Sequence, residues 1–306
     1  MSTLEQTLQS QNTSDSAPSK DFDREQWKLQ KHQEIEETFQ QLNDATMKLI
    51  QNPDRFKAFL DLQADLPAIS VGNALLVLDQ RSEPVTRLAT FDEWRDKGRA
   101  VKRGETGCKI LSPVTYKRTD GSEGTSFRVS KIFDIVQTHG DPLPEIPVAA
   151  VPADQLVRIL FSKSPVKIEA DDMISADVGA VYDPGSKTIR VHGKLPDDIA
   201  VSVLAREMAI ALLNTLHEEV GRDRIEFAGQ SAAYLIQKRY GHAPIGVDPS
   251  MVHDFAWPDD PIAVRATLND ARQAANMVCQ RIERGLENRE HPDNAKSPRK
   301  TSEPSR

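Results

Sequence analysis

The stretch FDEWRDKGRAVKRGETGCKILSPV, Phe91 to Val114, holds a helix start, a turn and a strand in close succession. Thr90 and Glu93 are spaced as in a capping box, which predicts a short helix at the start of this stretch. The runs Cys108 to Lys117 and Phe127 to Thr138 are strand-like, and the Asp-Gly pair between them is a hairpin signal. We therefore predict an antiparallel pair of strands here.

Helical patterns precede this stretch. Ile35, Phe39, Leu42 and Leu49 recur at helical spacing, which predicts one long helix over about 23–51. Shorter helices are expected around Phe56 and over residues 71–80. Helices followed by an antiparallel sheet indicate an α+β fold for the first half of the chain.

The second half is predicted to be mostly helical, with one β-hairpin. A helix is expected near 153–161, a hairpin around Pro184-Gly185, and further helices from about 196, over 223–240 and over 261–285. The proline-rich segment Asp141 to Pro152 separates the halves. We predict domains at 23–145 and 156–286, a linker at 146–155, and disordered tails at 1–22 and 287–306, because the tails have too few apolar residues to form a core.

The composition restricts the class of protein. The 306 residues include 39 Lys plus Arg and 46 Asp plus Glu, a net charge of -7, which argues against a uniformly basic nucleic-acid coat. The most apolar stretch, Ile199 to Leu213, is interrupted by charged residues, so no membrane-spanning helix is predicted. The N-terminus is not typical of a secretory signal, and the two cysteines fit a reducing compartment. We expect a cytoplasmic protein that does not bind membranes.

The charge is unevenly distributed along the chain. Residues 1–70 hold 7 basic and 12 acidic side chains, whereas residues 87–131 hold 11 basic and 6 acidic ones, a local charge of +5. Phe91, Trp94, Tyr116 and Phe127 lie in the same block. Cations beside aromatic rings suit single-stranded nucleic acid, because the cations contact phosphates and the rings stack on unpaired bases.

Three parts of the first half, Ser70–Val77, Phe91–Val114 and Phe127–Pro144, resemble the N-terminal domain of the ArdC antirestriction family in order and spacing. The resemblance covers roughly residues 30–145 and implies a single-stranded DNA-binding module. The residues predicted to contact DNA are Asn73, Trp94, Arg95, Lys97, Arg99, Lys102, Arg103, Lys109, Lys117 and Arg128.

The second half resembles the zincin-like metallopeptidase domain that ArdC-like proteins carry, but it lacks the metal ligands. Where that family has His-Glu-x-x-His, this chain has Arg206, Glu207 and Ile210, so only the general-base position is kept. Arginine stays protonated and isoleucine has no donor atom. The third ligand position aligns with Ala228 or Gln230, with Glu226 close by.

The histidines of this half do not rebuild a metal site. His192, His217, His242 and His253 do not occur at the spacing by which two ligands share a helix face. We therefore predict no zinc, no other cofactor and no peptidase activity.

Without a metal, the buried carboxylate of Glu207 would need another counter-charge. Arg206 and Arg224 are the candidates. Adjacent helix residues point about 100° apart, so we expect Arg206 to reach the helix of Glu226 rather than Glu207, or alternatively to lie in solvent.

Three functions are compatible with these features. The favoured one is a non-enzymatic, single-stranded DNA-binding protein of ArdC type, expected on a mobile element, with an inactive peptidase-like domain that packs or contacts a restriction, replication or conjugation protein. The second is a metallopeptidase with a rearranged site. The third is an acidic protein inhibitor of a restriction complex.

Overall fold

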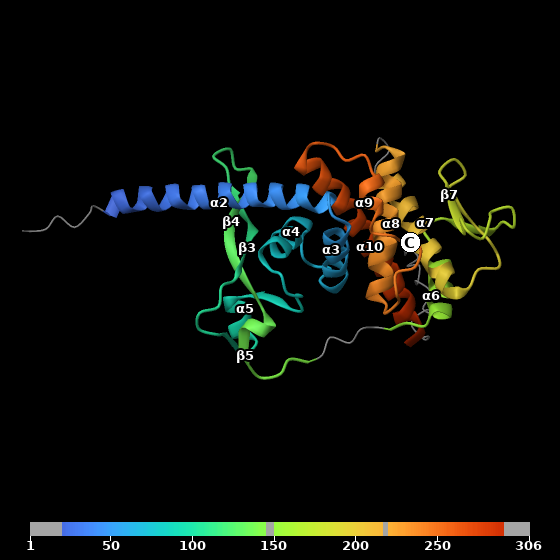
Figure 1. Ribbon diagram of the computed structural model, residues 1–306, viewed down its shortest axis with the longest axis horizontal. Helices are drawn as coiled ribbons and strands as arrows, with labels where there is room; N and C mark the ends of the chain where they lie inside the picture. The colour runs from blue at the N-terminus through green and yellow to red at the C-terminus, as the bar shows by residue number, and fades with distance from the viewer. Residues whose placement is uncertain (1–19, 145–149, 217–219, 291–306) are drawn as a thin grey trace, which may run out of the picture.

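The computed structural model describes residues 20–144, 150–216 and 220–290. The chain starts with a long helix, α2 (Lys20–Ile50), which is followed by α3 (Pro53–Asp65) and α4 (Val71–Gln80). Figure 1 shows the N-terminal part of α2 extending beyond the rest of the protein. Asn52 and Ser70 cap α3 and α4, each side chain accepting a hydrogen bond from a backbone N–H of the first turn.

The first sheet has the order β1-β4-β3 and is antiparallel. Strands β3 (Cys108–Lys117) and β4 (Glu123–Asp134) form the predicted hairpin, and β1 (Leu88–Thr90) pairs with the end of β4. The prediction of a strand over 127–138 is wrong at both ends. The strand ends early because the Asp134 side chain caps a 3-10 turn, η1 (Ile135–Gln137).

A second, two-stranded sheet lies beside the first. After the predicted short helix, α5 (Phe91–Asp96), β2 (Arg99–Val101) pairs with β5 (Thr138–Gly140). The capping box that begins α5 is present, with Thr90 and Glu93 each bonding the backbone N–H of the other. The α+β character predicted for this half is confirmed.

The second half begins with α6 (Ala153–Lys163) and a three-stranded sheet of order β6-β8-β7. Strands β7 (Ala180–Asp183) and β8 (Thr188–Val191) form the predicted hairpin, whereas β6 (Lys167–Ala170), parallel to β8, was not predicted. Its short sequence KIEA has too little alternation to stand out. The chain then continues through α7 (Asp197–Leu216), α8 (Arg222–Arg239), α9 (Met251–Asp254) and α10 (Pro261–Glu290).

Helix α7 is the central helix of the second half. It is long and apolar enough to cross a membrane, but 67% of its most apolar window is buried inside the protein. It packs against α6, α8, α10 and β7. A helix that is apolar on all sides and surrounded by other elements is a core helix.

The two predicted domains pack closely against each other. Helix α3 of the first half lies against α8 of the second, where Tyr234 Oη donates to Asp61 Oδ1 at 2.9 Å and Lys238 Nζ lies 3.0 Å from the same oxygen. The rings of Phe56 and Phe227 are 5.6 Å apart between centroids. Most buried apolar residues form one cluster from Leu42 to Ile282, so the two halves share the main core. A second, small cluster of Ala89, Trp94 and Phe133 lies within the first half.

The predicted boundaries between ordered and unordered segments need correction. Residues 153–155 of the predicted linker belong to α6. Of the tails predicted as disordered, residues 20–22 belong to α2 and residues 287–290 to α10, and residues 1–19 and 291–306 lie outside the described ranges. Residues 20–22 and 287–290 are mostly of types that tolerate a helix, so the neighbouring helices extend through them.

Candidate functional site

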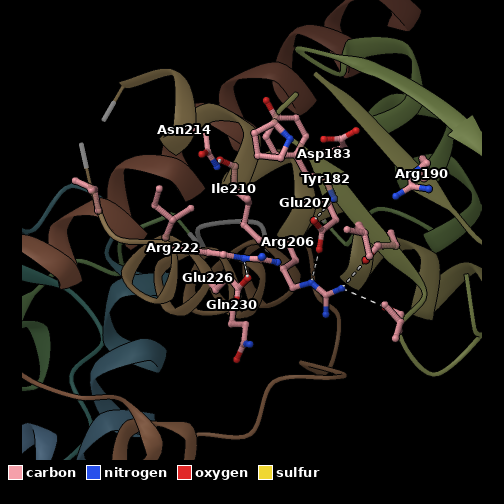
Figure 2. Close-up of a pocket in the computed structure, with 16 residues that line it drawn as sticks. Tyr182, Asp183, Arg190, Arg206, Glu207, Ile210, Asn214, Arg222, Glu226 and Gln230 are labelled. Atoms are coloured by element: carbon pink, nitrogen blue, oxygen red, sulfur yellow. Dashed lines mark hydrogen bonds and ion pairs between the residues drawn. The ribbon is translucent and has the colours of Figure 1, made fainter. Parts of the chain in front are cut away.

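A cleft of 570 Å³ lies between strand β7 and helices α7 and α8. Figure 2 shows Arg206 and Glu207 of α7 near its centre, with Arg222 and Glu226 of α8 to one side and Asp183 of β7 to the other. Arg206 and Glu207, which the sequence predicts to be part of a degenerate motif, therefore line a cleft.

Strand β7 is the edge strand beside this cleft. Gly179 O accepts a hydrogen bond from His192 N on the β8 side. In an antiparallel pair such bonded positions alternate with positions whose backbone groups point away from the partner strand. Ala180 and Tyr182 therefore turn their N–H and C=O groups away from β8, toward the cleft.

Helix α7 closes this open edge with two adjacent side chains. Arg206 Nη2 donates to Ala180 O at 3.0 Å and to Val178 O at 3.1 Å. The backbone N–H of Tyr182 donates to Glu207 Oε2 at 2.7 Å. The two side chains also bond each other, Arg206 Nε donating to Glu207 Oε1 at 2.7 Å. These residues thus take the place of a neighbouring strand along the edge of β7.

The ion pair is buried, and only one of its members has water access. The side chains of Arg206 and Glu207 are 24% and 6% exposed. Burial raises the pKa of the Glu207 carboxyl, while the Arg206 charge, its hydrogen bond and the N–H of Tyr182 act in the opposite direction. Glu207 is therefore a carboxylate held by fixed donors rather than a free base facing the cleft.

The expected partners of these arginines are corrected by the structure. Arg206 was expected to reach the helix of Glu226 or to lie in solvent, but it pairs with Glu207 because its long side chain folds back and overcomes the 100° offset between neighbours. Arg222 holds Glu226 instead, at 2.7 Å, and Arg224 pairs with Asp270.

The residues present do not fit a metal ion. The guanidinium of Arg206 fills the first ligand position with donors only. Ile210, at the second, packs on Gly229, where an added Cβ would lie 2.4 Å from Ile210 Cγ1. Of the candidate third ligands, Gln230 and Glu226 line the cleft. Within the described ranges, no group of three or more His, Cys, Asp or Glu residues could hold a metal ion.

The histidines considered as replacement ligands lie elsewhere. The Nε2 atoms of His242 and His253 contact the backbone oxygens of Val151 and Gln51. His192 Nδ1 is buried without a partner in the described part of the chain. His217 lies outside the described residues.

Two of the residues predicted to bind DNA, Trp94 and Asn73, make contacts that hold the fold together. Trp94 is 1% exposed and its Nε1 donates to Phe133 O at 2.9 Å, so it cannot stack on a base. The amide of Asn73 exchanges two hydrogen bonds with the backbone of Leu111, at 3.0 and 3.2 Å. Trp94 is therefore not available to a base, whereas the DNA contact of the half-buried Asn73 stays a prediction.

Asn73 belongs to a second closed strand edge. Gln80, at the C-terminal end of α4, makes the same pair of hydrogen bonds with the backbone of Lys109, at 2.7 and 2.9 Å. The two amides occupy the backbone groups of β3 that point away from β4. They fix α4 to the sheet and protect its edge.

The exposed part of the β3–β4 hairpin has two different faces. Directly opposed residues share a face and successive residues alternate, so Val114, Tyr116, Gly124 and Arg128 lie on one face, which we call the open face. Tyr116 packs over Gly124, where an added Cβ would lie 2.7 Å from the ring, yet it remains 47% exposed. The open face thus carries an aromatic ring and, further from the turn, the exposed side chain of Arg128.

Helix α2 covers the other face of the hairpin, as Figure 1 shows. The Phe39 ring of α2 meets Phe127 edge to face at 5.6 Å, and Glu34 lies 3.5 Å from Lys109 Nζ. Lys117 alternates to this same face. Lys109 is therefore paired within the protein and is a weaker candidate for phosphate than Arg128.

The remaining predicted DNA contacts lie around α5 and the turn that follows it. Arg99 donates to Thr138 Oγ1 and to backbone oxygens of 138, 140 and 141, so it mainly holds β2 to β5. Arg95 pairs with Asp92 at 3.0 Å, and Lys102 Nζ donates to Val136 O at 2.7 Å. Lys97 and Arg103 are exposed, without an ion pair to any described residue.

The sequence interpretation missed the particular role of Tyr116. The Asp-Gly signal does not give this register: a two-residue turn at 120–121 would place Tyr116 opposite Thr125, whereas the observed loop, closed by the bond from Arg118 N to Ser122 O, places it opposite Gly124. A large ring opposite glycine is free to lie flat across the hairpin.

The fold and the cleft define an α+β protein in which helices and a hairpin precede a helical half built on a small mixed sheet. No protein-family model and no curated protein matches the chain. Among solved structures it is similar to the Mn(II)-bound antirestriction protein ArdC from plasmid R388, with a TM-score of 0.54, 14% identity, and coverage of 78% of this chain and 97% of that chain. The metal-free structure of that protein gives a TM-score of 0.47 at 15% identity, covering 70% and 85%. The predicted ArdC-like fold is confirmed by the Mn(II)-bound structure.

Proposed function

We propose that this chain is a non-enzymatic, single-stranded DNA-binding protein with an antirestriction-type function, and that its peptidase-like half is inactive. The observation that carries the DNA-binding part is the open face of the hairpin, where the exposed ring of Tyr116 and the cation of Arg128 lie on one face. The ArdC fold supports the antirestriction part.

The open face offers the two contacts that a single strand needs. An exposed ring can stack on any base, and an arginine can contact phosphate without reading sequence. Helix α2 covers the opposite face and brings Glu34 to Lys109, so acidic groups would repel DNA there. We therefore place the strand on the open face, with Lys102 and Arg103 as further phosphate contacts.

DNA binding is tested by fluorescence anisotropy with a labelled single strand at ~50 and ~200 mM salt. Tyr116→Ala should weaken binding roughly tenfold, because stacking is worth about 1–3 kcal/mol per base. Arg128→Ala should reduce the salt dependence by about one unit of slope for all sequences. An unlabelled duplex competitor measures strand preference.

Two residues of α6 provide matched controls. Phe161 is 47% exposed, like Tyr116, and Arg158 is an exposed arginine. Their alanine variants should bind DNA as the parent does. Equal losses from the control and hairpin variants, or no binding at micromolar protein in low salt, would refute the open-face proposal.

The inactivity of the second half rests on the bonds made by Arg206. The guanidinium holds Glu207 and two carbonyls of β7, which leaves neither a free general base nor a ligand set for a metal. Mn(II) or Zn(II) should therefore leave the Tm unchanged, and a protein substrate should stay intact. Stoichiometric metal in the purified protein would instead favour a rearranged metallopeptidase.

We propose partners by chemical class. The ligand is single-stranded DNA, and the second partner is a restriction, replication or conjugation protein. We expect no membrane binding. If the protein protects DNA from a restriction enzyme only when Tyr116 is intact, protection acts through DNA. Protection that survives Tyr116→Ala would indicate direct contact with the enzyme.

A further inference from the structure

Arg81 is a buried arginine whose charge is almost without partners. It follows the last residue of α4, and its side chain is 13% exposed. The nearest carboxylate oxygen is that of Glu83, 3.8 Å from Arg81 Nη2, and Glu83 is itself 77% exposed. Arg81 Nε is buried with no hydrogen-bond partner in the described part of the chain.

This arrangement differs from that of the neighbouring arginine. Arg55 Nη2 donates to Asp79 at 3.2 Å, whereas the Arg81 guanidinium makes no side-chain hydrogen bond with the described residues. The C-terminal end of α4 supplies only a partial negative charge. Leaving a buried N–H donor such as Arg81 Nε unpaired is costly. An external acceptor would remove that cost.

Arg81 also has the space for such an acceptor beside it. It forms part of the wall of a 430 Å³ cavity together with Gln80, Ser82 and residues 106–108. It borders a second cavity of 350 Å³ that contains Asp61 and Asp65. These two cavities share Arg81 as a common wall.

The charges around the two cavities decide which of them suits an anion. The smaller cavity is lined by the carboxyl groups of Asp61, Asp65 and Glu83, so an anion would meet repulsion there. The larger cavity is lined by two carboxylates, Asp79 and Glu83. Asp79 is already paired with Arg55 and with Lys48 at 3.5 Å, and the side chain of Glu83 is 77% exposed, so water screens its charge. The larger cavity is therefore the site where the Arg81 charge is available.

We propose that Arg81 anchors a phosphate-binding site in the 430 Å³ cavity. A guanidinium binds phosphate through two parallel N–H···O bonds, and the hydroxyl of Ser82 lies at the same wall to accept or donate a further bond. The phosphate is that of a nucleic-acid backbone, of a strand end or of a small phosphate ester. The site is separate from the open face, so it does not depend on stacking at Tyr116.

The first measurement uses inorganic phosphate with the full chain. At about ten times its Kd, phosphate should raise the Tm of the parent by about 3 °C more than that of Arg81→Gln. In phosphate-free buffer Arg81→Gln should melt no lower than the parent, because it removes an uncompensated charge. Arg158→Gln, an exposed arginine on α6, should respond to phosphate as the parent does.

A second variant separates binding from folding. Arg81→Lys keeps the charge but loses the paired geometry, so its phosphate affinity should fall at least severalfold while its Tm in phosphate-free buffer stays close to that of the parent. Equal Tm shifts in the parent and in Arg81→Gln would overturn the proposal. So would a lower Tm of Arg81→Gln without phosphate, which would show a purely structural role.

Oligonucleotides then identify the source of the phosphate. Loss of affinity in Arg81→Gln only for a 5′-phosphorylated strand assigns a strand end, and equal loss with and without that phosphate assigns the backbone. Unchanged DNA affinity together with lost inorganic phosphate binding assigns a small phosphate ester. Tyr116→Ala tests the open face alone, and Arg81→Gln tests the phosphate site alone. Each proposal can therefore fail without the other.

Discussion

Replacing Arg206 with methionine tests whether the ion pair in the cleft holds α7 to β7. Methionine keeps an unbranched apolar stem, so the variant removes mainly the charge and its hydrogen bonds. Glu207, 6% exposed, would keep the N–H of Tyr182 but lose its counter-charge, and Ala180 O and Val178 O would lose their donor.

The expected loss is large for a single substitution. Removing one partner of a buried ion pair costs about 3–5 kcal/mol, because the other charge stays buried. A protein of this size loses about 2 °C of Tm per kcal/mol, so we expect a decrease of roughly 6–10 °C by calorimetry or differential scanning fluorimetry.

Arg222 provides a matched control within the same cleft. Its Nε also lies 2.7 Å from a glutamate oxygen, that of Glu226, but its side chain is 85% exposed. Because exposed pairs contribute little, Arg222→Met should change the Tm only slightly. A decrease for Arg206→Met no larger than that for Arg222→Met would refute the reasoning.

The pH dependence gives a second test of the same pair. Burial raises the pKa of Glu207 in the folded protein, and removing Arg206 raises it further. The folded variant then binds a proton at pH values where the unfolded chain has released it, so folding is favoured as the pH falls. The Tm deficit of Arg206→Met should therefore be greatest at neutral pH and should shrink as the pH falls toward about 4.3, the ordinary glutamate pKa. A deficit independent of pH would show that the charge of Glu207 is not its cause.

Other substitutions test separate parts of the structure. Trp94→Phe should lower stability by about 1–2 kcal/mol through its lost buried hydrogen bond while leaving DNA affinity unchanged in the anisotropy assay; weaker DNA binding would restore Trp94 as a contact. Gly229→Ala should cost about 1–3 kcal/mol in denaturant unfolding, because its Cβ would lie 2.4 Å from Ile210 Cγ1, whereas Gly193→Ala, whose Cβ would meet its nearest neighbour at 3.6 Å, should be near neutral. Asn73→Ala should lower the Tm and speed amide exchange in β3 without changing the salt dependence of DNA binding; a changed salt dependence would contradict its structural role.

Patterns within one element were readable from the sequence, and contacts between elements were not. The capping box of α5 and the Asp-Gly hairpin were predicted because their signals lie within a few residues. The partner of Arg206 was predicted wrongly because the direction of Cβ does not fix where a long side chain ends. The burial of Trp94 also depends on a residue 39 positions away along the chain, the carbonyl of Phe133.

Four polar side chains of α4 and α7 share a physical role. Asn73, and the unpredicted Gln80, close the outward edge of β3, while Arg206 and Glu207 close that of β7. An exposed strand edge presents unpaired N–H and C=O groups, and polar side chains from a neighbouring helix can satisfy them in place of another strand. A polar residue on an apolar helix can therefore bond the unpaired backbone groups of a strand edge, and its presence alone does not indicate a catalytic or binding role. The same reasoning accounts for the buried Glu207: its carboxylate accepts the backbone N–H of Tyr182 whether or not any metal or substrate is bound.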